Sequence, residues 1–402
     1  MSQLTTEVPS RSPRNNDRTM ASTKSTKAAK HSQGGLMLWH GMTISGVWRL
    51  FRSRPSLHWS RLHRSLSLPF SGVYNSVMAA AESAIYGRRI EKTEVKEPPL
   101  FVLGYWRSGT TLLQTLLSKD PNFQHLPLYR CLFPWHFLLT EKIVTKLTAP
   151  FVPKSRPMDN MSVSWDAPQE DDVSLCIMSQ VSPCMLLAHP TEFSHFWRSL
   201  QFEKLPQNEL QRWKDSLRLL VKKLTFTSPK RIMMKSPFHT FHVSTLLEMY
   251  PDARFLYIHR NPYNIFRSAV HLRHRMIDEN TLGKNVFDGS EEEVINSYKY
   301  GFEVYERDRQ LVPEGQLFEI SYEQLEVDPI ETLRGAYAGL GLPDFDQLEK
   351  ALQPELESLR QYKKNQFHDD PYWVDRVYEQ LKPAFDRFGY DKPGSATDEP
   401  AS

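Results

Sequence analysis

LFVLGYWRSGTTLLQTLLS, residues 100–118, is the stretch from which the fold of this chain can be inferred. Its first four residues form an apolar run bounded by turn-forming residues, the pattern of a strand buried on both faces. Residues 110–118 then place apolar side chains at helical spacing. Between strand and helix the frame is G-x-x-x-x-G, from Gly104 to Gly109. A strand, a glycine-framed loop and a helix are the context that a phosphate-cradling loop requires.

The cation of this loop does not stand where a nucleoside-triphosphate P-loop has it. Thr110 occupies the place of the Walker lysine, and the only cation in the loop is Arg107. We expect the backbone N–H groups of residues 108–111 to point at an anion, helped by about half a positive charge at the start of the helix. The alternative is a plain strand-to-helix turn.

Strand and helix patterns alternate in the rest of the chain. Residues 231–234, 254–259 and 316–321 read as strands, and helical patterns cover 239–250 and 291–311. Strands separated by helices predict an α/β fold with a central parallel sheet covered on both faces. We therefore expect a three-layer fold of the P-loop type, with a helical insertion and an N-terminal arm.

Composition divides the chain into segments. The expected segments are a disordered basic tail (1–34), a helical arm rich in basic and aromatic residues (35–97), the α/β domain (98–390) and a second disordered tail (391–402). Within the α/β domain, residues 126–228 show no strand–helix alternation. We expect them to form a helical insertion on the acceptor side of the domain.

Charge is unevenly distributed along the chain. Residues 1–64 contain eleven Lys or Arg and two acids, and no Asp or Glu occurs between Asp17 and Glu82. The arm interleaves five aromatic residues with five arginines: Trp39, Trp48, Phe51, Trp59 and Phe70 with Arg49, Arg52, Arg54, Arg61 and Arg64. Such a segment either packs on the main domain or lies on an anionic membrane surface, and an Arg/Ser-rich targeting segment is a third interpretation. We favour packing, because an enzyme that uses a soluble donor needs no membrane.

Several classes of protein are excluded by composition. Of the 402 residues, 40% are hydrophobic and 24% charged, the balance of a globular protein. No apolar run of eighteen residues occurs, so a membrane-spanning helix is not expected. The three cysteines, Cys131, Cys176 and Cys184, fit neither a zinc pattern nor a disulfide framework. We expect reduced thiols, no metal, no nucleic-acid partner and a cytoplasmic location with peripheral membrane contact as an option.

A second motif makes the chain recognisable. RFLYIHRNPYNIFRS, Arg254–Ser268, reads as a strand, then Arg-x-Pro, then a helix with Ser268 eight residues after Arg260. Together with WRSGTTLL at 106–113, it resembles the sulfotransferases that use 3′-phosphoadenosine 5′-phosphosulfate. The resemblance covers roughly Pro98–Leu342.

The resemblance implies a binding role for each motif. It implies these donor-binding residues: Arg107, Ser108, Gly109, Thr110 and Thr111 at the 5′-phosphate, and Arg260 and Ser268 at the 3′-phosphate. A planar guanidinium fork and a hydroxyl on the first helical turns suit phosphate oxygens.

Two further matches are shorter. MKSPFH, residues 234–239, resembles the family's strand end whose lysine, here Lys235, supports the transferring sulfuryl group. YEQL, residues 322–325, resembles a late Y-E-D-L motif, from which Gln324 departs, and we expect it to be structural. The glycine-bearing C-terminal lid of the family's cytosolic members is not recognisable.

The resemblance implies sulfuryl transfer to a hydroxyl or amine. Negative charge builds on the leaving phosphate oxygen, so fixed cations there, Arg107 and Lys235, would provide the main catalytic effect. The acceptor hydroxyl needs a general base, for which His239 and Glu170 both remain candidates. Glu170 begins an acidic patch, Glu170-Asp171-Asp172, that also suits a helix N-terminus.

Two other functions remain open. A P-loop kinase or nucleotide-binding protein would need the missing Walker lysine, and a non-enzymatic membrane-surface protein would have no need of Lys235 and Arg260. For the sulfotransferase we expect a small-molecule or glycan acceptor. The sequence does not name that acceptor or the oligomeric state.

Overall fold

The computed structural model describes residues 37–148, 164–360 and 369–394. The tail expected over 1–34 lies outside these residues, as do the last eight residues of the tail expected over 391–402.

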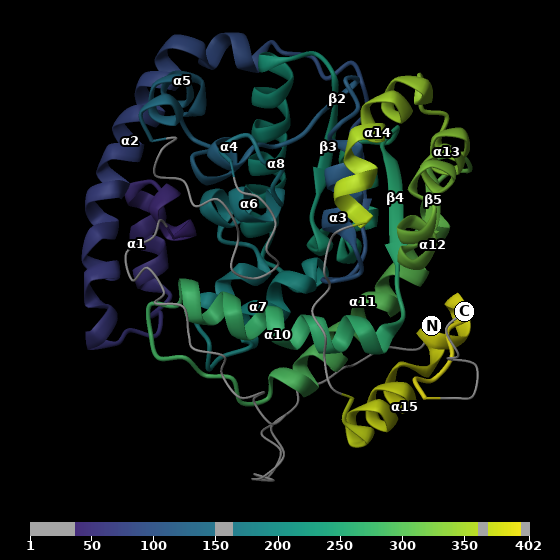
Figure 1. Ribbon diagram of the computed structural model, residues 1–402. Helices are drawn as coiled ribbons and strands as arrows, with labels where there is room; N and C mark the ends of the chain where they lie inside the picture. Colours follow the sequence, from purple (N-terminus) through teal and green to yellow (C-terminus); the bar gives the residue numbers. More distant parts are fainter. Residues whose placement is uncertain (1–36, 149–163, 361–368, 395–402) are drawn as a thin grey trace. The chain divides into compact units, whose positions relative to one another are not determined.

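A five-stranded parallel sheet forms the centre of the chain (Figure 1). Its strands are β1 (Leu100–Leu103), β2 (Phe123–Gln124), β3 (Arg231–Lys235), β4 (Arg254–His259) and β5 (Leu317–Ser321). Their order is β2-β3-β1-β4-β5. The predicted α/β fold with a parallel sheet is confirmed. The two-residue strand β2 was not predicted, because it is too short to carry a periodic pattern.

Alternate side chains of β1 and β4 enter two different cores. Leu100 and Val102 of β1 belong to a cluster with α3 (Thr110–Leu117), α13 (Pro329–Leu340) and α14 (Phe345–Arg360). Phe101 points the other way, where its ring stacks on Phe255 at 5.7 Å and lies near Tyr250. Because successive side chains of a strand face opposite sides, an all-apolar strand requires cover on both faces.

The second face of the sheet is covered by helices from the C-terminal half. They are α9 (Val243–Met249), α11 (Ser290–Asp308) and α15 (Pro371–Phe388). The ring of Tyr257 on β4 stacks on Tyr305 of α11 at 3.8 Å and lies near Phe388 of α15. The remaining helices of this half are α10 (Pro262–Asn280), against α11 and α15, and α12 (Tyr322–Val327), against α13.

Segment 126–228 holds helices in its described part. They are α4 (Leu128–Leu132), α5 (Phe137–Thr148), α6 (Asp171–Ser179), α7 (Ser194–Leu200) and α8 (Gln207–Thr227), with a 3-10 helix η4 (Pro183–Leu187). Helix α8 leads into β3, and α6 packs against both α4 and α8.

Helices α1 (Ile44–Arg52) and α2 (Leu62–Glu91) are the main elements of the arm's described part, which also holds the 3-10 helices η1 (Leu38–Gly41) and η2 (Trp59–Arg61). They approach closely at Gly72, where an added Cβ would lie 3.1 Å from the Cα of Ile44. Val47, Leu50 and Leu68 share a core cluster with α6 and η4. The arm is therefore packed on the neighbouring helices through one side only.

The expected burial of the arm's aromatic residues is correct for some and wrong for others. Trp39 is fully buried and donates from Nε1 to the Asn280 carbonyl at 2.8 Å, and Phe51 is half-buried. Trp48, Trp59 and Phe70 are exposed by 60%, 82% and 79%. The arm has only one buried side, so aromatic residues distributed around its helices cannot all face the domain.

The inner side of α2 is partly polar. The amide of Asn75 donates to the carbonyls of His40 and Met42 at 2.7 and 2.8 Å. Glu82 pairs with Lys223 of α8 at 2.5 Å, and both side chains are 3% exposed. None of the described helices is long and apolar enough to cross a bilayer.

The buried pair generates a stability prediction. Lys223→Met leaves the Glu82 carboxylate buried without its cation, so the free energy of unfolding should fall by about 3–5 kcal/mol. Urea denaturation of the full chain measures it. Lys222→Met is the control, since Lys222 is only half-buried and its ammonium donates to the Glu91 carbonyl at 2.7 Å rather than to a buried carboxylate. Equal stability of the two variants would contradict a structural role for the pair, and Glu82→Gln added to Lys223→Met should restore part of the loss.

Candidate active site

Three neighbouring strands end at the same edge of the sheet and carry the three sequence motifs. β1 lies between β3 and β4, with Val102 opposite Lys235 and Leu103 opposite Tyr257. All three strands are parallel, so the loop after β1, Lys235 at the end of β3 and Arg260 after β4 come together. The chain places β2 and β3 on one side of β1 and β4 and β5 on the other, which makes this edge a topological switch point, where α/β folds bind ligands.

The loop after β1 is held in a conformation that needs its glycines. Gly109 has φ +108°, and a Cβ there would lie 2.4 Å from the Tyr322 ring. Arg107 also has a positive φ, +73°, a strained state for a residue with a side chain. Thr240 ties the loop to the end of β3, because its hydroxyl accepts from the Gly104 N–H at 2.9 Å and donates to the Gly104 carbonyl at 3.2 Å.

The start of α3 is open to an anion. The helix begins at Thr110, and its N-cap residue is Gly109, which has no side chain that could cap the first N–H groups. The first N–H groups of a helix have no partner within the helix. The hydroxyl of Ser108 is buried and has no hydrogen-bond partner among the described residues. A buried polar group of this kind is normally satisfied by a ligand or water.

The two predicted phosphate motifs contact each other. Nε of Arg107 donates to the Ser268 hydroxyl at 2.8 Å, and an Arg260 N–H donates to the Arg107 carbonyl at 3.4 Å. The Arg260 guanidinium also lies over the Tyr322 ring, 4.0 Å from its centroid. Tyr322 therefore supports both Gly109 and Arg260, a positioning role that the motif YEQL did not reveal in the sequence.

Lys235 and Glu170 form an ion pair beside the loop. The ammonium lies 2.8 Å from the carboxylate oxygen and 3.4 Å from the Thr111 hydroxyl. The Lys235 side chain is 2% exposed, whereas that of Glu170 is 34% exposed. The pair joins the first motif to the acidic patch, and its carboxylate remains accessible.

His239, the other candidate base, lies in the core. It is fully buried, and its Nε2 lies 2.5 Å from a carboxylate oxygen of Asp171, which is also fully buried. The imidazole packs edge-on against Phe101 at 5.3 Å between ring centroids. His239 does not line the cavity described next. The Asp171 partnership could not be read from the sequence, since 68 residues separate the two.

A cavity of about 260 Å³ opens beside the ion pair. Thr111, Glu170 and Lys235 contribute to its lining. Most of the other lining side chains are apolar or aromatic: Tyr105, Trp106, Pro168, Val173, Pro183, Leu186, Leu187, Phe196, Ala269, Leu272, Met276 and Val294. The cavity can accept an apolar molecule and expose one of its polar groups to Glu170 and Lys235.

Asp172 is a buried acid in the cavity wall. One carboxylate oxygen accepts from the Ser182 hydroxyl at 3.0 Å and from the Cys184 thiol at 3.3 Å. The other has no partner among the described residues. Burial raises the pKa of Asp172 to about 7. Arg273, also in the wall, lies over Phe196 at 5.0 Å. Neither residue was predicted as part of the site from the sequence, in which only the acidic patch pointed to Asp172.

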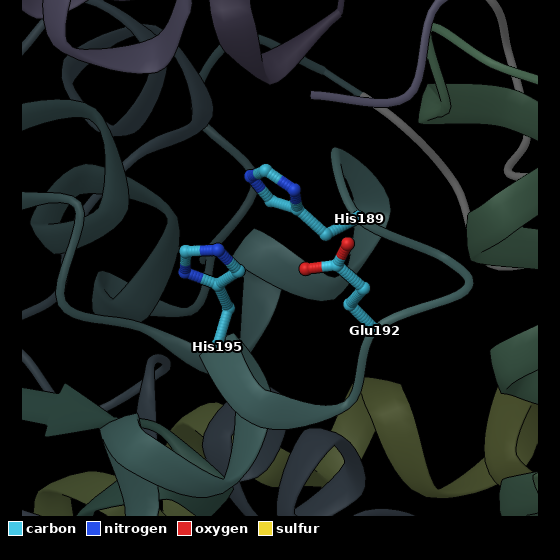
Figure 2. A group of neighbouring side chains, drawn as sticks. All are labelled: His189, Glu192 and His195. Carbon is cyan, nitrogen blue, oxygen red and sulfur yellow. The ribbon is translucent and has the colours of Figure 1, made fainter. Parts of the chain in front are cut away.

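His189, Glu192 and His195 form a group that could hold a metal ion (Figure 2). One ligand atom from each lies within 4.8 Å of the others. The imidazoles stack at 4.0 Å, Nε2 of His189 lies 3.0 Å from the Ser53 hydroxyl, and burial lowers the pKa of His189 to about 4. The group does not line the cavity. Its spacing, H-x-x-E-x-x-H, was not recognised in the sequence.

The fold and the site define a sulfotransferase. Residues 98–347 match the model of the sulfotransferase family, and the chain belongs to that family. The membership confirms the resemblance inferred from the motifs and implies 3′-phosphoadenosine 5′-phosphosulfate as the sulfuryl donor. The chain is an enzyme that transfers a sulfuryl group, and the kinase alternative is not favoured.

Mycobacterial proteins are among its relatives. The omega-hydroxy-beta-dihydromenaquinone-9 sulfotransferases Stf3 of Mycobacterium bovis and Mycobacterium tuberculosis are each 34% identical to it, over 94% of this chain and 96% of theirs. The fold is similar to sulfotransferase STF9 of Mycobacterium avium (TM-score 0.61, 20% identity, 79% of this chain and 83% of that one). It is also similar to STF1 of M. tuberculosis H37Rv (TM-score 0.57, 17% identity, 88% and 94%).

The buried carboxyl of Asp172 predicts a pH dependence. Its pKa is about 7 in the folded protein and near 3.8 when unperturbed, so between these values the folded state holds a proton that the unfolded state has lost. The free energy of unfolding therefore falls as the pH rises from about 4 to 7. Asp172→Asn should remove this contribution to the pH dependence of the free energy of unfolding, which is at most about 4 kcal/mol. Denaturation at pH 5 and pH 8 gives the difference in the free energy of unfolding between the two pH values. Asp252→Asn, at an exposed aspartate, is the control. If Asp172→Asn shows the same difference as the unchanged chain, Asp172 is not the group responsible.

Proposed function

We propose that this enzyme transfers the sulfuryl group of 3′-phosphoadenosine 5′-phosphosulfate, without a metal, to a hydroxyl of an apolar, lipid-like acceptor. The observation that carries the proposal is the cavity in which the Glu170–Lys235 pair meets apolar walls beside the Arg107 loop. Donor, catalytic groups and acceptor then share one edge of the sheet.

The donor lies along the loop and the start of α3. The N–H groups of residues 108–111 and the Ser108 hydroxyl receive the 5′-phosphate, where the helix dipole favours an anion. Arg260 and Ser268 receive the 3′-phosphate. Support comes from the contacts of Arg107 with both residues, which bring the two phosphate sites next to each other.

The chemistry is a displacement at sulfur. The acceptor oxygen forms a bond to sulfur, the bond from sulfur to the bridging phosphate oxygen breaks, and that oxygen leaves with the electron pair. Lys235 and Arg107 stabilise the charge that develops there. Glu170 takes the proton of the acceptor hydroxyl. We prefer Glu170 to His239 because Glu170 lines the cavity and is accessible, whereas His239 is enclosed with Asp171.

The acceptor is inferred from the cavity walls and from relatives. The lining is predominantly apolar, which suits a hydrocarbon better than a glycan whose many hydroxyls would each need a partner. The relatives at 34% identity are named for a hydroxylated dihydromenaquinone. A hydroxylated isoprenoid-type lipid fits both. Several lining residues, among them Glu170, Asp172 and Phe196, belong to segment 126–228, which supports its proposed place on the acceptor side.

The same proposal bears on location. The donor is a soluble nucleotide and the acceptor is a lipid, so the reaction belongs at a membrane surface that faces the cytoplasm. Peripheral contact through residues 36–70 is part of this proposal.

Burial raises the pKa of the Cys131 and Cys176 thiols, which keeps them protonated and unreactive.

Donor binding tests the proposal directly. Calorimetry in EDTA should show that adenosine 3′,5′-bisphosphate binds, because arginine and lysine side chains, and not a metal ion, supply the positive charge of the proposed donor site. Arg260→Ala should weaken that ligand at least tenfold more than adenosine 5′-phosphate, since a charged hydrogen bond contributes about 1.5–3 kcal/mol. Binding that needs Mg²⁺, or equal losses for both nucleotides, would refute these roles. Arg254→Ala, which removes an arginine at the opposite end of β4, is the control.

The choice of base is tested by two matched variants. Glu170→Gln keeps the shape of the side chain and should lower kcat by about 10²–10⁴ while donor affinity is kept. His239→Gln should change kcat by less than about tenfold. Unchanged donor affinity serves as the check that this variant is folded. The measurement is turnover with labelled donor and a long-chain alcohol. The opposite ranking of the two variants would make His239 the base.

A further inference from the structure

We infer that the outward face of α1 and α2 docks on an anionic lipid surface. Among the described residues, sixteen large hydrophobic side chains are exposed, and eleven of them lie between residues 44 and 85. They are Ile44, Trp48, Leu57, Trp59, Leu62, Leu66, Phe70, Val73, Tyr74, Val77 and Ile85, here named the docking face. Isolated exposed apolar residues are ordinary, but a concentration of this kind marks an interaction site.

Helix α2 presents a continuous apolar stripe to solvent. Leu62, Leu66, Phe70, Val73 and Val77 follow one another at intervals of four, four, three and four residues, so they lie on one side of the helix. A helix on the surface of a protein in water normally turns its polar side outward. The stripe therefore faces an environment other than water.

The buried side of α2 is partly polar, since it carries Leu68 and Ile90 together with three polar residues. Ser65, Asn75 and Glu82 are buried polar residues on the opposite side of the helix. Asn75 and Glu82 have partners there, Asn75 with Nε2 of His136 at 3.0 Å and Glu82 with Lys223. Because both are satisfied, the helix cannot simply rotate to bury the stripe without breaking these bonds.

The preceding elements extend the face with aromatic residues. Ile44 and Trp48 lie one turn apart on α1, whose first backbone N–H donates to the Ser76 hydroxyl of α2 at 2.9 Å. Trp59, in the connection between the helices, is 82% exposed. Tryptophan is favoured at the boundary between hydrocarbon and water, because its ring is large and apolar and its N–H is polar.

Charge identifies the occupant as an anionic surface. Residues 37–81 contain five arginines and no Asp or Glu. Arg52 and Arg54 are exposed, and the Arg52 guanidinium lies 5.1 Å from the centre of the Trp48 ring. An apolar helix face flanked by arginines is the pattern of a helix that lies in the headgroup region of an anionic bilayer. The same face of a second copy would offer these arginines no carboxylate partner from residues 37–81.

The arm that carries the docking face packs with its buried side against a wall of the acceptor cavity, so this inference rests on the proposed function. The buried side of the arm contributes Val47 and Leu50 to a core cluster. That cluster also contains Leu187 and packs against Cys184 and Met276, and all three of these residues line the cavity. The arm is thus the outer support of one cavity wall. Docking it on a bilayer brings the cavity close to lipids held there.

Vesicle flotation of the full chain tests the inference. The chain should float with vesicles of phosphatidylglycerol and phosphatidylcholine, less with phosphatidylcholine alone, and less again as salt is raised. Trp59→Gln with Phe70→Gln should weaken flotation by about tenfold or more. Leu311→Gln with Val327→Gln is the matched control, because these residues are exposed and apolar but lie outside the docking face. Arg52→Gln with Arg54→Gln should remove the preference for anionic vesicles.

The outcomes separate this inference from the proposed function. Binding of adenosine 3′,5′-bisphosphate should be unchanged in the Trp59/Phe70 variant, so loss of flotation with intact donor binding supports docking. Failure of the wild-type chain to float overturns docking and leaves the donor site standing. A dimer in solution that the Trp59/Phe70 variant converts to monomer, without flotation of either, would show that a second copy covers the face. Equal flotation of the test and control variants would overturn the assignment of the face.

Discussion

The position of β1 between β3 and β4 is the constraint on which the rest of the site depends. Parallel strands end at one edge, so a loop, a lysine and an arginine that are far apart in the chain are brought together there. The register sets their relative heights, with Lys235 opposite Val102 and β4 running on to Arg260. The left-handed backbone at Gly109, which the Tyr322 ring would deny to any side chain, then turns the start of α3 toward that edge.

Three consecutive acids at the start of α6, Glu170, Asp171 and Asp172, lie in three different environments. Glu170 precedes α6 and reaches Lys235 at the cavity, Asp171 turns into the core to meet His239, and Asp172 returns to the cavity wall. Each residue of a helix is rotated by about 100° from the one before it, so neighbours in sequence enter different environments. Only the first is both accessible and paired with a cation beside the donor loop. The same acidic patch thus supplies the carboxylate that we propose as the base, a buried partner for the His239 ring and a buried acid in the cavity wall.

The arm adds a second use of buried polarity. Asn75 and Glu82 fix the orientation of α2 through specific bonds, and this orientation leaves an apolar stripe outside. A helix held only by hydrophobic contacts would have buried that stripe. Polar anchors on the inside are therefore what make an apolar outside stable in the folded chain. An enzyme whose acceptor is held in a membrane can use such a helix to support its cavity and to meet the lipid surface with the same element.

The local motifs, and with them the family, could be predicted from the sequence alone. Apolar periodicity and glycine positions predict the strand before Gly104, the helix after Gly109 and the strand before Arg260. These signals act between residues only a few positions apart in the chain. The environment of each side chain could not be predicted in this way, because it depends on contacts between distant segments. The sequence left both Glu170 and His239 open as bases, and the fold gives them different environments, Glu170 in the cavity lining and His239 in the core against Asp171. The sequence also favoured packing of the arm's aromatic residues on the main domain. In the folded chain only one side of the arm is covered, so Trp39 is buried and Trp59 and Phe70 are exposed. Tertiary structure decided these environments, because only the neighbours that folding brings together determine which groups lose their contact with water.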